Sequence, residues 1–182
     1  MFENNDRPDI AERYATACNS SNLRVEAERG SSADVIIASG WSKSRVGGAL
    51  MRLHTEYAST GKPANASETD YRLMMMGLKS LGVVLEQVTL SAGKMGIDRP
   101  QAVALAVIAH WLDDVCKSCN KLGKKRIPGT PMLSSSACNA CKGTGSPLLP
   151  HGEAGRKVEE FMLYCLQCWK TSTSQGLYGR RK

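Results

Sequence analysis

Three Cys-x-x-Cys pairs stand in the last part of the chain: CKSC at residues 116–119, CNAC at 138–141 and CLQC at 165–168. These first, second and third pairs hold six of the seven cysteines. Two such pairs supply the four thiolates of a tetrahedral structural zinc site, which leaves no open position for a catalytic water. The chain has one pair more than one site requires. We expect one structural Zn²⁺ per chain and no enzymatic activity.

Two pairings of these cysteines compete. The first and second pairs are 18 residues apart, a generic zinc-ribbon spacing, and the second and third are 23 apart. The context favours the later two, because the first pair directly follows a long apolar helix pattern. Gly143 and Gly145, by contrast, let the chain turn around the thiolates of the second pair. We predict a metal site of Cys138, Cys141, Cys165 and Cys168, with Cys116 and Cys119 as less favoured ligands.

The composition indicates a mainly helical protein. Hydrophobic residues make up 42% of the chain and aromatic residues only 5%, which suits a core of aliphatic side chains better than a β-sandwich. The sequence has no run of 18 apolar residues, and its charged N-terminus lacks the apolar region of a secretory signal. We therefore expect a cytoplasmic metal-binding protein with reduced cysteines, no membrane partner and no small-molecule substrate.

The pattern predicts a helical bundle with a small four-cysteine zinc-binding module in its C-terminal third. Residues Gln101–Val115 are apolar nearly all round, which is typical of a buried central helix. A second amphipathic helix is expected at Glu153–Phe161, inside the module. The expected parts are a polar segment at 1–31, a helical domain at 32–119, a basic Gly/Pro/Ser-rich loop at 120–136, the zinc module at 137–170 and a basic tail at 171–182.

Residues 34–39 and 42–57 predict two helices separated at Gly40. Such a pair is compatible with a DNA-binding helix-turn-helix or with a packed helical hairpin. Gly47 and Gly48 disfavour a recognition helix, since glycine weakens a helix interior. Both interpretations stay open at this point.

Positive charge coincides with the cysteines. Residues 117–182 carry twelve Lys and Arg against three Glu, a balance of +9, while the whole chain has a net charge of +7. Such a basic segment indicates a nucleic-acid contact surface, or else a solvated basic segment with no partner.

One enzymatic alternative is a zinc nucleobase deaminase. His151 and Glu153, followed by the third cysteine pair, partly match its H-x-E…P-C-x-x-C pattern. Tyr164 stands where that pattern has proline, and an α/β framework is missing. We therefore place this function last.

Four motifs follow one another along the chain: the segment SADVIIASGWSKSRVGGALMRL (32–53), the helix ending HWLDDVCKS (110–118), the DnaJ-like knuckle CNACKGTG (138–145) and CLQC (165–168). In this order of motifs, over roughly residues 32–170, the chain resembles the late-gene antitermination protein Q family of lambda-like phages. The resemblance implies a DNA-binding factor in the cytoplasm of a bacterial host. It would engage RNA polymerase and its sigma factor at a late promoter and promote read-through of terminators.

The resemblance implies double-stranded DNA as a partner and places the zinc on the second and third cysteine pairs. Base reading would need a helix in the major groove, for which Glu153–Phe161 is the candidate. A zinc-knuckle protein-interaction module of chaperone or adaptor type is the alternative function. The basic residues predicted to contact DNA are Lys124, Lys125, Arg126, Arg156, Lys157, Lys170, Arg180, Arg181 and Lys182.

Overall fold

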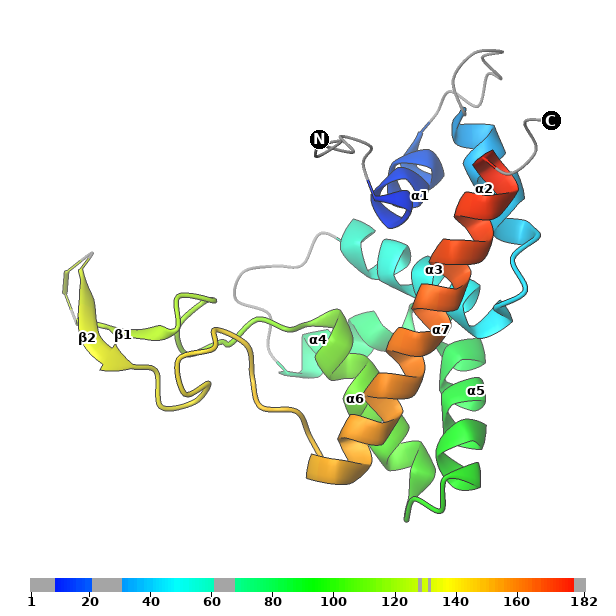
Figure 1. The fold of residues 1–182 in the computed structure, drawn as a ribbon. Helices are drawn as coiled ribbons and strands as arrows, with labels where there is room; N and C mark the ends of the chain where they lie inside the picture. Colours follow the sequence, from blue (N-terminus) through cyan, green and yellow to red (C-terminus); the bar gives the residue numbers. More distant parts are fainter. Residues whose placement is uncertain (1–8, 21–30, 61–67, 128, 131, 179–182) are drawn as a thin grey trace, which may run out of the picture. The chain divides into compact units, whose positions relative to one another are not determined.

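The computed structural model describes residues 9–20, 31–60, 68–127, 129–130 and 132–178. This part of the chain is mainly helical, with a single two-stranded antiparallel sheet, which confirms the predicted fold class (Figure 1). The elements are α1 (Ile10–Asn19), α2 (Ser32–Gly40), α3 (Arg45–Ser59), α4 (Glu68–Met76), α5 (Leu81–Lys94), α6 (Pro100–Leu112), β1 (Lys124–Arg126), β2 (Leu133–Ala137) and α7 (Gly152–Tyr178).

The chain forms two compact units. Unit 1 comprises residues 1–87 together with 161–182, and unit 2 comprises residues 88–160. Their boundaries fall inside α5 and α7 and not in the polar linkers that the sequence suggested. The described part of the predicted polar segment contains α1. The predicted basic loop contains β1 and all of β2 except Ala137, and the predicted basic tail begins as helix.

Trp169 of α7 is the centre of unit 1. Its side chain is fully buried, and its Nε1 donates a hydrogen bond of 3.0 Å to the Ser39 hydroxyl of α2. The ring of Tyr14, from α1, meets the indole edge-on with centroids 5.4 Å apart. Three helices that are distant in sequence thus converge on one aromatic side chain, whose hydrogen bond removes the cost of burying its N–H.

The glycine pair of α3 is explained by its contact with α7. A Cβ on Gly47 would lie 2.2 Å from the Cys165 carbonyl oxygen and 2.7 Å from the Trp169 Cβ, so only glycine allows this approach. The Ser44 hydroxyl, just before α3, donates to the same carbonyl at 2.9 Å. The glycine face of α3 is therefore a packing surface. This packing disfavours the interpretation of α3 as an exposed DNA-recognition helix.

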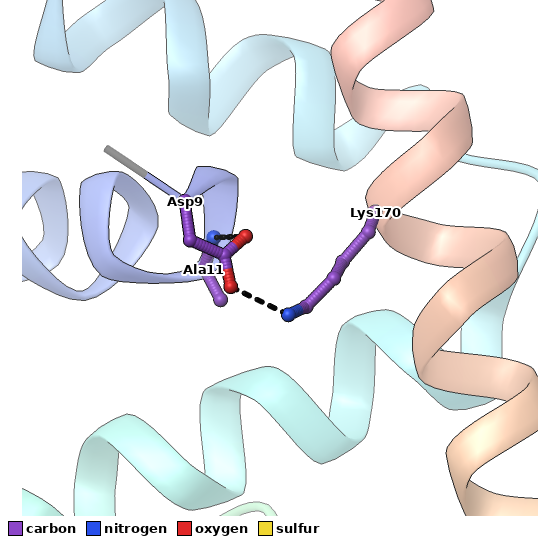
Figure 2. Close-up of polar contacts among 3 residues, drawn as sticks. All are labelled: Asp9, Ala11 and Lys170. Carbon is purple, nitrogen blue, oxygen red and sulfur yellow. Dashed lines mark hydrogen bonds and ion pairs between the residues drawn. The ribbon is translucent and has the colours of Figure 1, made fainter. Parts of the chain in front are cut away.

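Lys170 ties α7 to the start of α1. Its Nζ lies 2.6 Å from the Asp9 carboxylate, whose other oxygen accepts the Ala11 N–H at 3.3 Å and caps α1 (Figure 2). The hydrogen bond from Lys170 is the main reason that the pKa of Asp9 lies below its usual value, while partial burial opposes the shift.

We expect Asp9→Asn to remove part of the acid sensitivity of unit 1. Because the pKa of Asp9 is lower in the folded state, the ion pair contributes fully above the unfolded value of about 3.9 and is lost as pH falls through the folded value. The pair is partly exposed, so its contribution is about 0.5 kcal/mol. Asparagine is as good an N-cap as aspartate, which isolates the ion pair from the cap. Unfolding free energies between about pH 7 and 3 should then fall less steeply for the variant; an unchanged slope contradicts the assignment.

Unit 2 is built on α6, whose buried side chains follow a helical spacing. The helix ends at Leu112, three residues earlier than predicted, and residues 113–116 have no regular secondary structure. Leu105 is 43% exposed, so the helix is not buried on all sides as expected. The buried residues of α6 are Val103, Ala104, Val107, Ile108 and Leu112.

Candidate metal centre

Four cysteines of unit 2 meet in one buried cluster. The Sγ atoms of Cys116, Cys119, Cys138 and Cys141 all lie within 4.8 Å of one another, and all four residues are buried. The Sγ atoms of Cys116 and Cys138 are 4.0 Å apart, and those of Cys119 and Cys141 are 3.7 Å apart. None of these thiols is in a disulfide. The four are positioned to hold a metal ion.

The sulfur spacing fits a tetrahedral ion. A regular tetrahedron with metal–sulfur bonds of about 2.3 Å, the zinc value, has sulfur–sulfur edges of about 3.8 Å. The separations of 3.7 and 4.0 Å bracket that length. The cluster therefore needs little rearrangement to close around one ion.

The cluster is made from two copies of one motif. Each copy reads Cys-x-x-Cys-x-x-x-Gly, at residues 116–123 and 138–145, so each position recurs 22 residues later. The copies exchange backbone hydrogen bonds: the Cys116 N–H donates to the Gly145 carbonyl at 3.0 Å, and the Cys138 N–H donates to the Gly123 carbonyl at 2.8 Å. The two copies, the first knuckle (116–123) and the second knuckle (138–145), thus hold each other in place.

The backbone repeats as well. Asn120 and Lys142, the residues after each second cysteine, have φ of 49° and 52°. The glycines that end the knuckles, Gly123 and Gly145, have φ of 68° and 81°. A Cβ on Gly123 would lie 2.4 Å from the Gly143 carbonyl oxygen, and one on Gly145 would lie 2.5 Å from that of Lys121. Glycine is required at both ends, for conformation and for space.

Backbone N–H groups at the knuckles act on the thiols. Burial disfavours a thiolate at Cys141, but the N–H groups of Gly145 and Gly143 donate to its sulfur, the former at 3.3 Å, and lower its pKa to about 6. Burial instead raises the pKa of Cys119, which faces Cys141, to about 12. One buried thiolate disfavours the next. A bound cation would compensate the charge of such thiolates.

We expect Gly145→Ala to weaken metal binding by roughly tenfold or more, since supporting interactions of metal ligands are worth about 10–100-fold. The added Cβ would collide with the Lys121 carbonyl and strain a left-handed backbone, so the knuckle must shift. Gly93→Ala in α5 is the control, because its Cβ would meet nothing within 4 Å. Competition with a chromogenic chelator measures both affinities; equal values would show that the knuckle tolerates the change.

The predicted pairing of the second cysteine pair with the third is wrong. Cys138 and Cys141 have their partners in Cys116 and Cys119. Cys165 and Cys168 lie in the middle of α7, where the backbone N–H groups are used by the helix and cannot wrap a metal. The 18-residue spacing was the correct guide. A long helix does not lead directly into Cys116, because α6 stops at Leu112 and the chain can turn before the first pair.

The predicted DNA-contacting residues are spread over both units. In unit 2, Lys124 and Lys125 are exposed on β1, Arg156 is exposed on α7, and Lys157 pairs with Glu153 at 3.1 Å. In unit 1, Lys170 is engaged by Asp9. The side chain of Arg126 and residues Arg180, Arg181 and Lys182 lie outside the described part of the chain.

Sequence reasoning missed residues that carry the site. Gly123 was not recognised as the counterpart of Gly145, although the motif repeats at a constant offset. The absence of acidic residues was also missed: residues 115–152 contain six Lys and Arg and no Asp or Glu. Two of those basic residues, Lys117 and Lys142, are exposed within the knuckles.

Comparisons of the chain with protein-family models, curated proteins and solved structures found no match. Within the described residues, no helix is both long and apolar enough to cross a membrane.

Proposed function

We propose that the protein is a zinc-containing factor that binds double-stranded DNA and acts in transcription antitermination. The observation that supports this proposal best is the charge of residues 115–152; Asp113 and Asp114 precede this range, and Asp114 pairs with Lys121 at 3.0 Å. From residue 115 to 152 every formally charged side chain is Lys or Arg, and this segment contains the four-cysteine cluster. A duplex with phosphates on both strands is the natural partner of such a surface.

Zinc fits the four-sulfur donor set. Four thiolates close the coordination sphere, so the ion has a structural role, and its binding supplies folding free energy to a segment with little core. A zinc ion with four thiolates carries a charge of about −2, which leaves the segment positive because it holds six basic side chains. The exposed Lys117 and Lys142 stand beside the cysteines and favour that negative centre.

Antitermination is the activity suggested by the order of the quoted motifs along the chain. In this proposal the basic segment of unit 2 holds the protein on DNA near a late promoter, and helical surfaces contact RNA polymerase and its sigma factor. Phosphate contacts of this kind give affinity that falls with salt and carry little sequence information. DNA binding is thus separable from the effect on polymerase.

A read-through assay with purified components tests the function. The template carries a late promoter of the genome that encodes the protein, followed by a terminator, and is transcribed by bacterial RNA polymerase with its sigma factor. We expect the zinc-loaded protein to increase the fraction of transcripts that extend past the terminator, and Cys138→Ser to lose this effect together with its metal. DNA binding without any change in read-through would exclude antitermination and leave a DNA-binding protein.

A polypeptide-binding module is the second candidate, and exposed apolar side chains of unit 2 favour it. Met132 is 65% exposed and Leu148 is 58% exposed, and both lie in the segment between α6 and α7. An electrophoretic mobility shift assay separates the two functions. A protein that leaves duplex DNA unshifted but binds an extended apolar peptide would be an adaptor or chaperone-like module.

A further inference from the structure

We propose that the β1–β2 ribbon of unit 2 enters the major groove of duplex DNA, with Lys124 and Lys125 contacting phosphates on opposite walls of the groove. This inference rests on the proposed DNA-binding function and assigns it to an element. It replaces the helix at Glu153–Phe161 as the DNA-reading element. In the structure that segment belongs to α7, with Val158 buried, and it carries Glu153, Glu159 and Glu160 beside its two basic residues.

The ribbon grows directly from the metal centre. Gly123 of the first knuckle precedes β1, and Cys138 of the second knuckle follows β2. The hydrogen bond between the Cys138 N–H and the Gly123 carbonyl, 2.8 Å long, is both a brace of the centre and the first rung of the ribbon. A two-stranded hairpin alone is marginally stable in water. The metal centre therefore holds the ribbon in register at its base.

Both faces of the ribbon are open to solvent. Lys124 and Lys125 of β1 are exposed, and so are all residues of β2 except the half-buried Ser134. Two-stranded antiparallel sheets usually bury one face to be stable. A ribbon with two open faces is suited to a partner that surrounds it, as the walls of a groove do.

The cations lie on both faces. Successive residues of a strand point to opposite sides, so Lys124 and Lys125 project from opposite faces of β1. The residues of β2 are mostly small: Ser134, Ser135, Ser136 and Ala137 keep that strand thin. The resulting ribbon has positive charge on both sides and little bulk on one strand, which matches a groove bordered by two phosphate backbones.

The dimensions agree with this assignment. The ribbon runs from the Gly123–Cys138 rung to the hydrogen bond between the Ile127 N–H and the Met132 carbonyl, 3.2 Å long. Four residue steps of a strand span about 13 Å. The major groove of B-DNA is about 8.5 Å deep and about 12 Å wide and admits a two-stranded ribbon. The major groove of duplex RNA is too deep and narrow to admit it, which favours DNA.

A bulge in β2 supplies further donors. Lys124 pairs with Ala137 and Arg126 with Leu133, so three serines of β2 stand opposite the single residue Lys125. The Ser134 hydroxyl accepts the Ser136 N–H at 3.1 Å and holds the bulge. Bulges interrupt pairing with a further strand, and serine hydroxyls bind phosphates and base edges. The ribbon is thus protected against strand addition and equipped for polar contacts in the groove.

The test uses the full-length, zinc-loaded protein and a fluorescently labelled DNA duplex. Binding is followed by anisotropy between about 50 and 200 mM salt. For Lys124→Ala/Lys125→Ala we expect weaker binding. The slope of the logarithm of the binding constant against the logarithm of the salt concentration should be smaller in magnitude by about two, because each lost phosphate contact removes about 0.9 from that slope. Lys79→Ala/Lys94→Ala removes the same charge from two exposed lysines outside the ribbon and should bind like the wild type. Metal content and circular dichroism verify that both variants are folded.

A second measurement distinguishes binding in the major groove from binding in the minor groove. Methylation of guanine N7, which lies in the major groove, should reduce binding, whereas a minor-groove drug such as netropsin should not compete. Competition by netropsin with no effect of N7 methylation would overturn the major-groove assignment. Equal effects of the two double variants would overturn the role of the ribbon while DNA binding stands. Tighter binding to single-stranded DNA or to duplex RNA would also overturn it, and a wild type that binds no duplex would remove the proposed function itself.

Discussion

Replacing Cys116 with serine is expected to abolish metal binding, whereas replacing Cys168 should leave it intact. Cys116 contributes one of the four clustered sulfurs, and Cys168 lies in the continuous helix α7. Structural zinc sites are worth about 10–16 kcal/mol in small modules, so a three-sulfur remnant should bind far more weakly. Metal analysis after gel filtration should give one zinc per chain for the wild type and Cys168→Ser, and none for Cys116→Ser.

The consequence of that loss should be local. The segment between α6 and α7 has β1 and β2 as its regular elements and buries little apart from its cysteines. We therefore expect Cys116→Ser to become sensitive to proteolysis at residues 113–150 while keeping most of its helical circular dichroism. Metal retained by Cys116→Ser and lost by Cys168→Ser would instead restore the pairing of the second and third cysteine pairs.

The metal centre could have been predicted from the sequence more fully than it was. The 18-residue spacing identified the correct pairs, and the glycines after each knuckle repeat with the same offset of 22 residues as the cysteines. The prediction gave weight to Gly143 and Gly145 but overlooked Gly123, so one knuckle seemed to lack its turn. A repeat that includes the glycines is stronger support than cysteine spacing alone, because the backbone around each thiolate needs them.

The long helix α7 was divided by the prediction because its cysteines were taken as ligands. Its buried residues nevertheless follow one helical stripe, since Val158, Met162, Cys165, Trp169 and Thr173 recur at three- and four-residue steps. Cys165, which lies on this stripe, is better interpreted as a small apolar packing residue. The mainly helical class was predictable because composition and periodicity are local properties.

The partners of α7 were not predictable from local patterns. The approach of α7 to Gly47, and the hydrogen bond from Trp169 to Ser39, join residues more than 100 positions apart. Nothing in the spacing of α3 identifies which helix covers its glycines. The unit boundaries inside α5 and α7 have the same cause, because they depend on tertiary packing and not on linker composition.

Trp169→Ala is expected to produce the largest loss of stability among single changes in unit 1, about 3–5 kcal/mol. The side chain is fully buried, and its removal leaves a large cavity and an unpaired Ser39 hydroxyl. Trp169→Phe should cost less, because it keeps most of the packing with Tyr14 and loses the hydrogen bond, worth about 1–3 kcal/mol when a buried partner is left unsatisfied. Denaturant unfolding followed by circular dichroism measures these differences.

Tyr164→Ala is the matched control, because Tyr164 lies on the same helix and is 68% exposed. Its loss should change the unfolding free energy by no more than about 0.5 kcal/mol. Trp169→Ala should still bind one zinc, since all four clustered cysteines belong to unit 2. If Trp169→Ala and Tyr164→Ala were equally stable, α7 would not form the core of unit 1. If Trp169→Ala lost its metal, the centre would depend on unit 1 for its folding.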